Sequence, residues 1–458
     1  MLPSKLQSSR SVSETDLGPS DQKRLTSVDR DKPDLEKEFI LRLPFEILAH
    51  IVNIVSSDPD CSRHSYSTWK TLSVVCRRFA FIVLPVLYRH IEIQIPLLNP
   101  PLRRLHLTSQ RVSALRDHCK ELHIRINATT PPTNEDLFLV QDLISYLSNV
   151  QVLSIQGGYD KSFLQCASQY MRRVHSLDLR RKMGGFFLRD IVEQIDIPSL
   201  QNLTLCGVYR QSTSTEASVL LEPKKFRTAT FTSLVLGDYE ETPEATQQLI
   251  NWPESLVHFR FDCSYNNIFY MDLPMFGEWL AIHKDTLKSI NIGYLPFGGN
   301  ERLLYASGFP KLEVLTLSRW QLGGWPRSLH EKLIFSTLHA DTLLGPNLHT
   351  FILDFSMYGQ HFEAWTDFGE QEEHWVTGFA KAAIDRKAAL RKIQIIFKPN
   401  TKESTEEQGY PWDRMDRIRD EIQIHGLALE YNKPCLTKEE WLQPLRENPY
   451  VYRIPSDG

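Results

Sequence analysis

The sequence has little of what marks several common protein classes. Its seven cysteines are single and dispersed, with no C-x-x-C pair and no histidine at zinc-finger spacing. An odd, scattered set argues against a disulfide framework and fits a reducing compartment, with small buried side chains as the default role. The formal net charge is −4, so the basic excess that usually accompanies nucleic-acid binding is missing as well. We therefore expect neither a disulfide scaffold nor a nucleic-acid partner.

Long apolar runs and a secretory signal are also missing. The longest clear apolar run, Phe81 to Leu87, is far shorter than the roughly 20 residues that a membrane-spanning helix needs. The N-terminus is polar and contains no apolar core that could serve as a signal. These absences predict a soluble chain without membrane contacts, located in the cytoplasm, the nucleus or both.

Motifs for catalysis are lacking too. There is no Gly-rich phosphate loop and no G-x-S-x-G element, and His330-Glu331 has no second histidine of a zinc protease. Single histidines on expected strands, such as His123, His258 and His349, are interpreted as ordinary surface or core residues. We expect no catalytic residue, metal or cofactor, although catalytic groups can converge from distant positions.

Composition and periodicity divide the chain into four segments. Residues 1–37 are rich in serine and charged residues and have no aromatics, which is typical of a disordered tail. An apolar helical module is expected over residues 38–90 and a long region of alternating strands and helices over 91–431. Residues 432–458 are expected to form a C-terminal cap and tail.

The first expected helix, which begins near Pro44, is apolar over about half of its circumference at 100° per residue. The apolar positions are Pro44, Phe45, Ile47, Leu48, Ile51, Val52, Ile54 and Val55. A surface helix normally needs an apolar stripe of roughly 100°. The surplus is covered either by a partner protein or by the domain that follows, and periodicity alone favours neither.

This module resembles the F-box. The resemblance is carried by Leu43-Pro44-x-Glu46-Ile47-Leu48-x-x-Ile51, Leu72-Ser73-x-Val75-Cys76-Arg77-x-Phe79 and Leu84-x-x-Leu87-Tyr88. It is closest to the F-box of large fungal families, in which a Leu-Tyr-Arg-His element commonly follows, as it does at Leu87 to His90. The match covers residues 41–88 and departs from compact F-boxes in the long polar loop from Ser56 to Tyr66.

A six-residue pattern, apolar-x-x-apolar-x-apolar, recurs through the rest of the chain. Copies begin at Cys119, Val150, Val174, Leu200, Phe231, Leu256, Leu287, Leu312, Leu348 and Leu390. The pattern is the strand signature of a leucine-rich repeat, and each interval has room for one helix. The usual asparagine is missing and the intervals are irregular, which resembles the degenerate repeats found behind many F-boxes. The expected fold class is α/β: a three-helix F-box, then a leucine-rich-repeat-like solenoid with parallel strands on the concave face and helices outside.

Local signals extend this pattern at both ends. Thr133 to Asp136 reads as a capping box before an apolar helix, and Arg89 to Ile95 alternates like a first strand. Near the end, a strand at Leu427 to Tyr431 and a helix start at Thr437 would close the array. The acidic run Glu370 to Glu373 is interpreted as a solvated loop.

The resemblance implies a substrate-recognition subunit of an SCF-type (Skp–cullin–F-box) ubiquitin ligase. Such a subunit binds a Skp-family adaptor, and through it a cullin, while its repeats hold a substrate protein and catalysis takes place elsewhere. The adaptor-binding residues implied are Leu43, Pro44, Glu46, Ile47, Ile51, Leu72, Val75, Cys76 and Phe79. Three alternatives stay open: a leucine-rich-repeat interaction scaffold outside ubiquitination, an F-box protein that binds its adaptor without directing ubiquitination, and a repeat-borne enzyme or enzyme activator.

Candidate substrate-binding residues come from the expected concave face. They are Arg260, Asp262, Asn291, Thr316, Ser318, Arg319 and Trp320. Exposed tryptophan and arginine are frequent binding anchors, but burial of Trp320 against the next helix is an equal alternative. Two basic groups, Arg180 to Lys182 and Lys224 to Arg227, are interpreted as solvated loop charges, with phosphate binding as the weaker reading.

Overall fold

A computed structural model describes most of the chain, which it divides into two compact units, residues 1–63 and 64–458. The described residues are 43–57, 69–74, 77–95, 113–127, 132–157, 161–181, 186–210, 221–263, 269–295, 303–322, 333–355, 368–399, 409–434 and 436–442. The expected tail over 1–37, Val75, Cys76 and the segment after 442 lie outside these ranges.

The first unit contributes one described helix, α2 (Phe45–Ser57). Leu48 and Val52, one turn apart, are buried. Ile47, Ile51 and Ile54 are exposed at 47%, 45% and 59%. Because residues at i, i+4 and i+7 share a helix face, these three isoleucines form one exposed apolar stripe along α2.

The second unit opens with helical residues 69–74 and with α4 (Arg77–Leu87). Phe79, Ile82 and Val83 of α4 are buried. Pro85 lies inside the last turn, near the point where the chain leaves the helix for the first strand.

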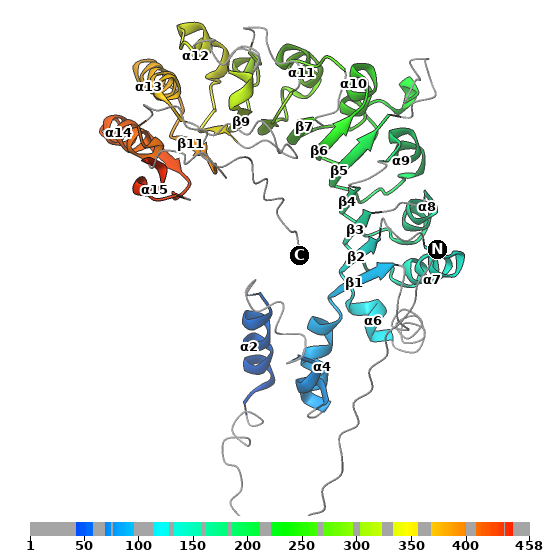
Figure 1. Cartoon of the computed structure of the whole chain (residues 1–458). Helices are drawn as coiled ribbons and strands as arrows, with labels where there is room; N and C mark the ends of the chain where they lie inside the picture. Colours follow the sequence, from blue (N-terminus) through cyan, green and yellow to red (C-terminus); the bar gives the residue numbers. More distant parts are fainter. Residues whose placement is uncertain are drawn as a thin grey trace, which may run out of the picture. The chain divides into compact units, whose positions relative to one another are not determined.

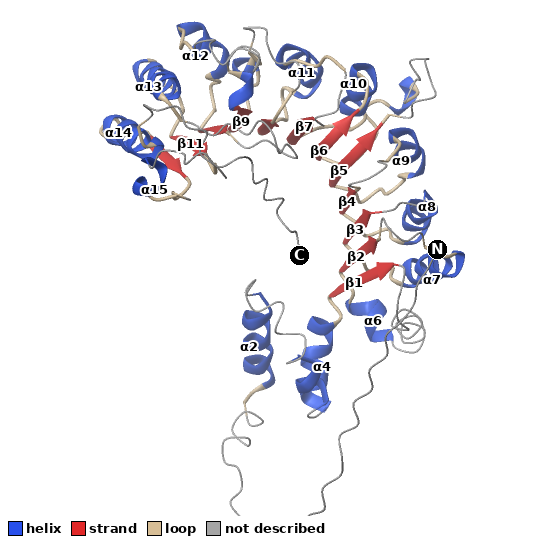
Figure 2. Cartoon of the chain, in the orientation of Figure 1, coloured by secondary structure: helices blue, strands red, loops and turns tan. Residues whose placement is uncertain are grey.

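Twelve parallel strands then form one open sheet whose spatial order is the order of the sequence. The labelled strands can be followed in this order in Figures 1 and 2. They are β1 (His90–Ile95), β2 (Glu121–Ile126), β3 (Val152–Gly157), β4 (Ser176–Arg180), β5 (Asn202–Tyr209), β6 (Ser233–Glu240), β7 (His258–Cys263), β8 (Ser289–Ile292), β9 (Val314–Ser318), β10 (Thr350–Asp354), β11 (Lys392–Ile396) and β12 (Ala428–Tyr431). A strand stands at each of the ten recurrences of the six-residue pattern, and β1 and β12 stand at the two expected ends. The α/β class and the open parallel sheet are therefore confirmed.

Helices cover one face of the sheet (Figure 2); those from α6 to α14 connect successive strands, and α15 follows β12. They are α6 (Ser113–His118), α7 (Asn134–Tyr146), α8 (Lys161–Tyr170), α9 (Leu188–Gln194), α10 (Pro243–Asn251), α11 (Leu273–Leu280), α12 (Thr337–Leu343), α13 (Glu370–Asp385), α14 (Pro411–Gln423) and α15 (Lys438–Leu442). Short 3₁₀ turns lie at Pro223–Lys225, Ala281–His283, Ala306–Gly308 and Arg319–Gln321. The capping box expected at Thr133 is confirmed, since the Thr133 hydroxyl accepts from the Asp136 amide at 3.2 Å.

Register puts the apolar residues of each pattern on the helix-covered face. Leu177, Leu203 and Leu234 occupy one register row and are fully buried. A single core cluster runs from Ile91 in β1 to Trp441 in α15. Since strand side chains alternate between faces, the residues between these apolar positions form the other face of the sheet. Within the described residues, no helix is long and apolar enough to cross a lipid bilayer.

Candidate functional site

The face of the sheet opposite the helices carries polar side chains, and the clearest cluster spans β4 to β7. On β4, the Arg180 Nε donates to both carboxylate oxygens of Asp178 at 2.9 Å. On β7, the Arg260 Nε donates to the Asp262 Oδ2, also at 2.9 Å. The two pairs occupy alternate strand positions with reversed order, Asp-Leu-Arg on β4 and Arg-Phe-Asp on β7. We call these four residues the Arg–Asp surface.

Small residues lie between the two pairs. Cys206 of β5 is the register partner of Arg180, and Gly237 of β6 is the register partner of Cys206. A Cβ on Gly237 would lie 2.9 Å from the Cys206 Sγ, so the absence of a side chain at this position leaves room for the thiol. Burial raises the pKa of the Cys206 thiol, and the charges of Arg180, Asp178, Asp262 and Arg260 all act on it. Cys206 therefore lies beside Arg180 on the polar face, one strand from β4 and two strands from β7.

Asp262 is the most buried member of the Arg–Asp surface, with its side chain 6% exposed. Burial raises its pKa, while the charge and hydrogen bond of Arg260 act in the opposite direction. Its second oxygen, Oδ1, has no hydrogen-bond partner among the described residues. A Cβ on Gly293 would come within 1.8 Å of this oxygen, so only glycine leaves it room.

The two arginine side chains differ in how much of their surface is exposed to solvent. Arg180 is 54% exposed, and within the described part of the chain its two Nη groups donate no hydrogen bond. Arg260 is 34% exposed. A guanidinium that a neighbouring carboxylate orients through its Nε suits bidentate recognition of a carboxylate, a phosphate or a pair of peptide carbonyls. Because each arginine is paired with an aspartate, the surface is close to neutral and suits a polar peptide better than a polyanion.

The candidate substrate-binding residues named from the sequence differ in how exposed they are. Asn291 is half-buried between Arg260 and Thr316 in one register row. Thr316, Ser318 and Arg319 are buried at 5%, 1% and 3% exposure, so these side chains offer little surface to a partner. The Trp320 side chain lies outside the described residues.

Arg319 has a structural partner that the sequence did not indicate. Its Nε and Nη2 donate to the Glu372 Oε1 at 2.9 and 2.6 Å. Glu372 belongs to α13 and is itself 5% exposed. The interpretation of Glu370 to Glu373 as a solvated loop is therefore wrong: this run is the first turn of α13, where acidic side chains are favoured by the helix dipole.

The residues implied for adaptor binding are placed in both units. In the first unit, Pro44, Glu46, Ile47 and Ile51 are exposed and Leu43 is half-buried. In the second unit, Leu72 is half-buried and Phe79 is buried at 6%. Val75 and Cys76 lie outside the described residues. An exposed residue not named for this role, Val74, accompanies Leu72 with 79% of its surface accessible.

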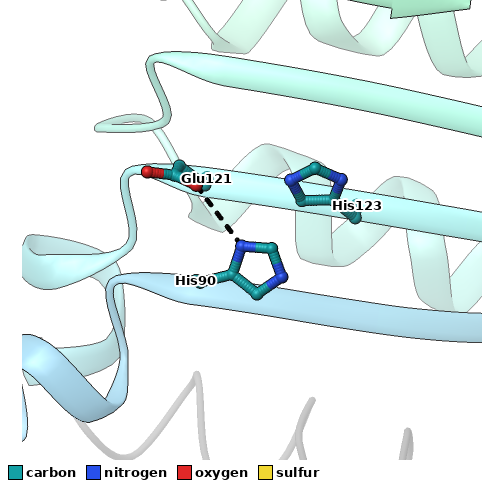
Figure 3. A group of neighbouring side chains, drawn as sticks. All are labelled: His90, Glu121 and His123. Carbon is teal, nitrogen blue, oxygen red and sulfur yellow. Dashed lines mark hydrogen bonds and ion pairs between the residues drawn. The ribbon is translucent and has the colours of Figure 1, made fainter. Parts of the chain in front are cut away.

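One group of side chains has the composition of a metal site. His90, Glu121 and His123 lie on β1 and β2 at the edge of the polar face, and a potential ligand atom from each lies within 4.8 Å of the others. Figure 3 shows the two imidazoles and the carboxylate gathered over the two strands. From the sequence, His123 was interpreted as an ordinary surface or core residue and no metal ligand was expected. The strand register, which puts Glu121 opposite His90, is the signal that could have indicated this group.

The Arg–Asp surface was missed in part as well. Arg180 was interpreted as a solvated loop charge, yet it is the last residue of β4 and faces the same side as Arg260. The signal lay in its position, because Arg180 follows the final apolar residue of the pattern, Leu179, and alternation turns it to the polar face. Comparison of the chain with models of known protein families and with curated proteins returned no match.

Proposed function

We propose that this chain is the substrate-recognition subunit of an SCF-type ubiquitin ligase: an F-box that binds a Skp-family adaptor, followed by a leucine-rich-repeat-like solenoid that binds a substrate protein. The observation that carries the proposal is the exposed stripe of Ile47, Ile51 and Ile54 on α2. It lies within the segment whose Leu-Pro-x-Glu opening resembles the F-box. Three isoleucines in a row on one helix face are what an adaptor would cover.

Energetics support a binding role for this stripe. Each exposed isoleucine leaves apolar surface in contact with water. Full burial of such a side chain contributes about 1.5–3 kcal/mol to the free energy of binding. The neighbouring Leu48 and Val52 are already buried, so α2 does not depend on the stripe for its own packing. Glu46, exposed in the first turn, offers a charge at the edge of the stripe that can orient a partner.

The Arg–Asp surface supports the second half of the proposal. Its paired charges and the small residues between them lie on a rigid parallel sheet, which holds a binding surface with little loss of entropy. A substrate held there would be brought close to the ubiquitin-carrying enzyme. The contribution of this chain to the reaction is then effective concentration, with no bond made or broken by its own residues.

Co-purification with a Skp-family adaptor tests the proposal. The full chain is co-expressed with the adaptor, and the double variant Ile47→Asp, Ile51→Asp is compared with wild type. Placing carboxylates in an apolar interface costs about 2 kcal/mol or more per hot-spot position, which is a loss of affinity of roughly thirtyfold or greater. We expect the wild type to retain the adaptor and the variant to lose it.

Phe138→Asp is the matched control, because Phe138 is 64% exposed on α7, a helix of the same length in the solenoid. This control should keep the adaptor. Failure of the wild type to bind, or equal binding by wild type and the double variant, would reject the F-box assignment and leave a repeat scaffold outside ubiquitination. A ubiquitination assay with the assembled ligase then separates an active subunit from one that only binds its adaptor.

A further inference from the structure

We propose that His90, Glu121 and His123 bind a divalent transition-metal ion of the Zn²⁺ class. Two imidazole nitrogens and one carboxylate oxygen are the donor set that zinc takes in sites with an open position. The three potential ligand atoms already lie within 4.8 Å of one another. The proposed site is made wholly by β1 and β2 and is independent of the SCF assignment.

The backbone fixes the three residues in a compact arrangement. His90 is the register partner of Glu121, and Glu92 is the register partner of His123, on adjacent parallel strands. Because residues i and i+2 of a strand point to the same face, Glu121 and His123 lie side by side and His90 faces both of them from β1 (Figure 3). In a tetrahedral site with Zn–N and Zn–O bonds of about 2.0–2.1 Å, ligand atoms are roughly 3.3 Å apart. Side-chain rotations on a fixed backbone close the remaining distance.

The three side chains already lie near the arrangement that a bound metal ion would require. The two imidazole centroids are 4.5 Å apart with an interplanar angle of 35°. The His90 Nδ1 and the Glu121 Oε2 are 3.4 Å apart, which is long for a hydrogen bond. A metal ion would draw all three groups together.

The surrounding charges leave the site usable by a cation. Glu92 is already engaged by Arg125 at 3.1 Å, and Arg89 lies 3.7 Å from the Glu121 Oε1. Arg89 is 67% exposed, so it can turn away into solvent.

The accessibility of the ligands defines what such a site can do. His90 is 50% exposed and Glu121 is 35% exposed. Three protein ligands leave at least one coordination position, which faces the polar side of the sheet and takes water or a carboxylate, imidazole or thiolate from a partner protein. The ion would also tie β1 to β2, where the sheet begins.

The test is metal titration of the full-length chain after treatment with a chelator. Zn²⁺ binding is measured by calorimetry, and Co²⁺ is added in parallel to read ligand geometry from its visible absorption. We expect one tight equivalent per chain and at least tenfold weaker binding for His123→Gln and for the isosteric Glu121→Gln.

The matched control is His258→Gln. His258 occupies the same register row as His90, six strands further along, with serines as its neighbours on both sides. It should leave the tight equivalent unchanged, and far-ultraviolet circular dichroism confirms that each variant is folded. Absence of a tight equivalent in the wild type, or equal affinity in wild type, His123→Gln and Glu121→Gln, would overturn the proposal.

Discussion

Two adjacent glutamates at the start of α13 show how burial changes the value of an ion pair. Glu372 is buried against Arg319, and it also accepts from the Gly369 amide at 2.9 Å. Glu373 is half-buried and binds Arg414 and Arg417 of α14, the second of which is 58% exposed. A buried pair leaves an uncompensated charge when one partner is removed, whereas an exposed pair is replaced by water.

Arg319→Met should destabilise the protein by about 3–5 kcal/mol, because it strands the Glu372 carboxylate in the interior. Urea unfolding followed by tryptophan fluorescence, to which buried Trp375 on α13 contributes, measures the change. Arg417→Met removes a partner of Glu373 and should cost less than about 1 kcal/mol. Equal losses in the two variants would contradict the distinction, and Arg319→Met combined with Glu372→Gln should recover part of the loss.

The residue scale is where the sequence was least informative. Glu372 meets Arg319 across 53 residues, and His123 meets His90 across 33. No local pattern encodes either pairing, because each depends on which strands and helices become neighbours. Thr316 and Ser318 show the same limit: alternation put them on the polar face, but it could not tell that both would be buried.

At the scale of elements the sequence predicted much more. Each copy of the apolar pattern produced a strand because its residues alternate between a core and a second face. The capping box at Thr133 located the start of α7 correctly, since its bonds are local. The acidic start of α13 was missed because a run of charges was interpreted without its position at a helix N-terminus.

Glycines at strand ends supply a test of these elements. Gly207 of β5 has φ +83°, and a Cβ there would lie 1.8 Å from the Arg181 carbonyl oxygen. Gly426, after α14, has a similar φ of +78°, and no atom of the described residues lies within 4 Å of its Cβ position. Gly426→Ala should therefore cost about 1–2 kcal/mol from backbone strain alone.

Gly207→Ala should lower the free energy of unfolding by about 1–3 kcal/mol more than Gly426→Ala, because its methyl group also collides with the backbone at Arg181. Urea midpoints of the two variants measure the difference, with both compared with wild type. If the two substitutions were equally costly, the close approach of Arg181 to Gly207 would contribute nothing.

At the scale of the molecule, the sheet is linear in sequence. Every strand pairs only with the strands before and after it, from β1 through β12. The helices from α6 to α14 likewise lie between consecutive strands, so contacts between distant parts of the sheet pass through the intervening strands. Stability in such an arrangement is close to a sum of local terms and of terms between neighbours.

This linear order predicts that a core defect stays local. Leu177 of β4 and Leu353 of β10 are both fully buried pattern leucines six strands apart. Replacing either with alanine removes about 2–5 kcal/mol of packing. Hydrogen exchange read by mass spectrometry should show lost protection in the mutated strand and its immediate neighbours only.

The two variants serve as controls for each other. Leu353→Ala should expose β9 to β11 and leave β3 to β5 at wild-type protection, and Leu177→Ala should give the reverse. Uniform loss of protection along the sheet in both variants would mean that the twelve strands unfold as one cooperative unit. In that case a partner bound at one end would stabilise the whole sheet, whereas local unfolding confines such stabilisation to the strands near the partner.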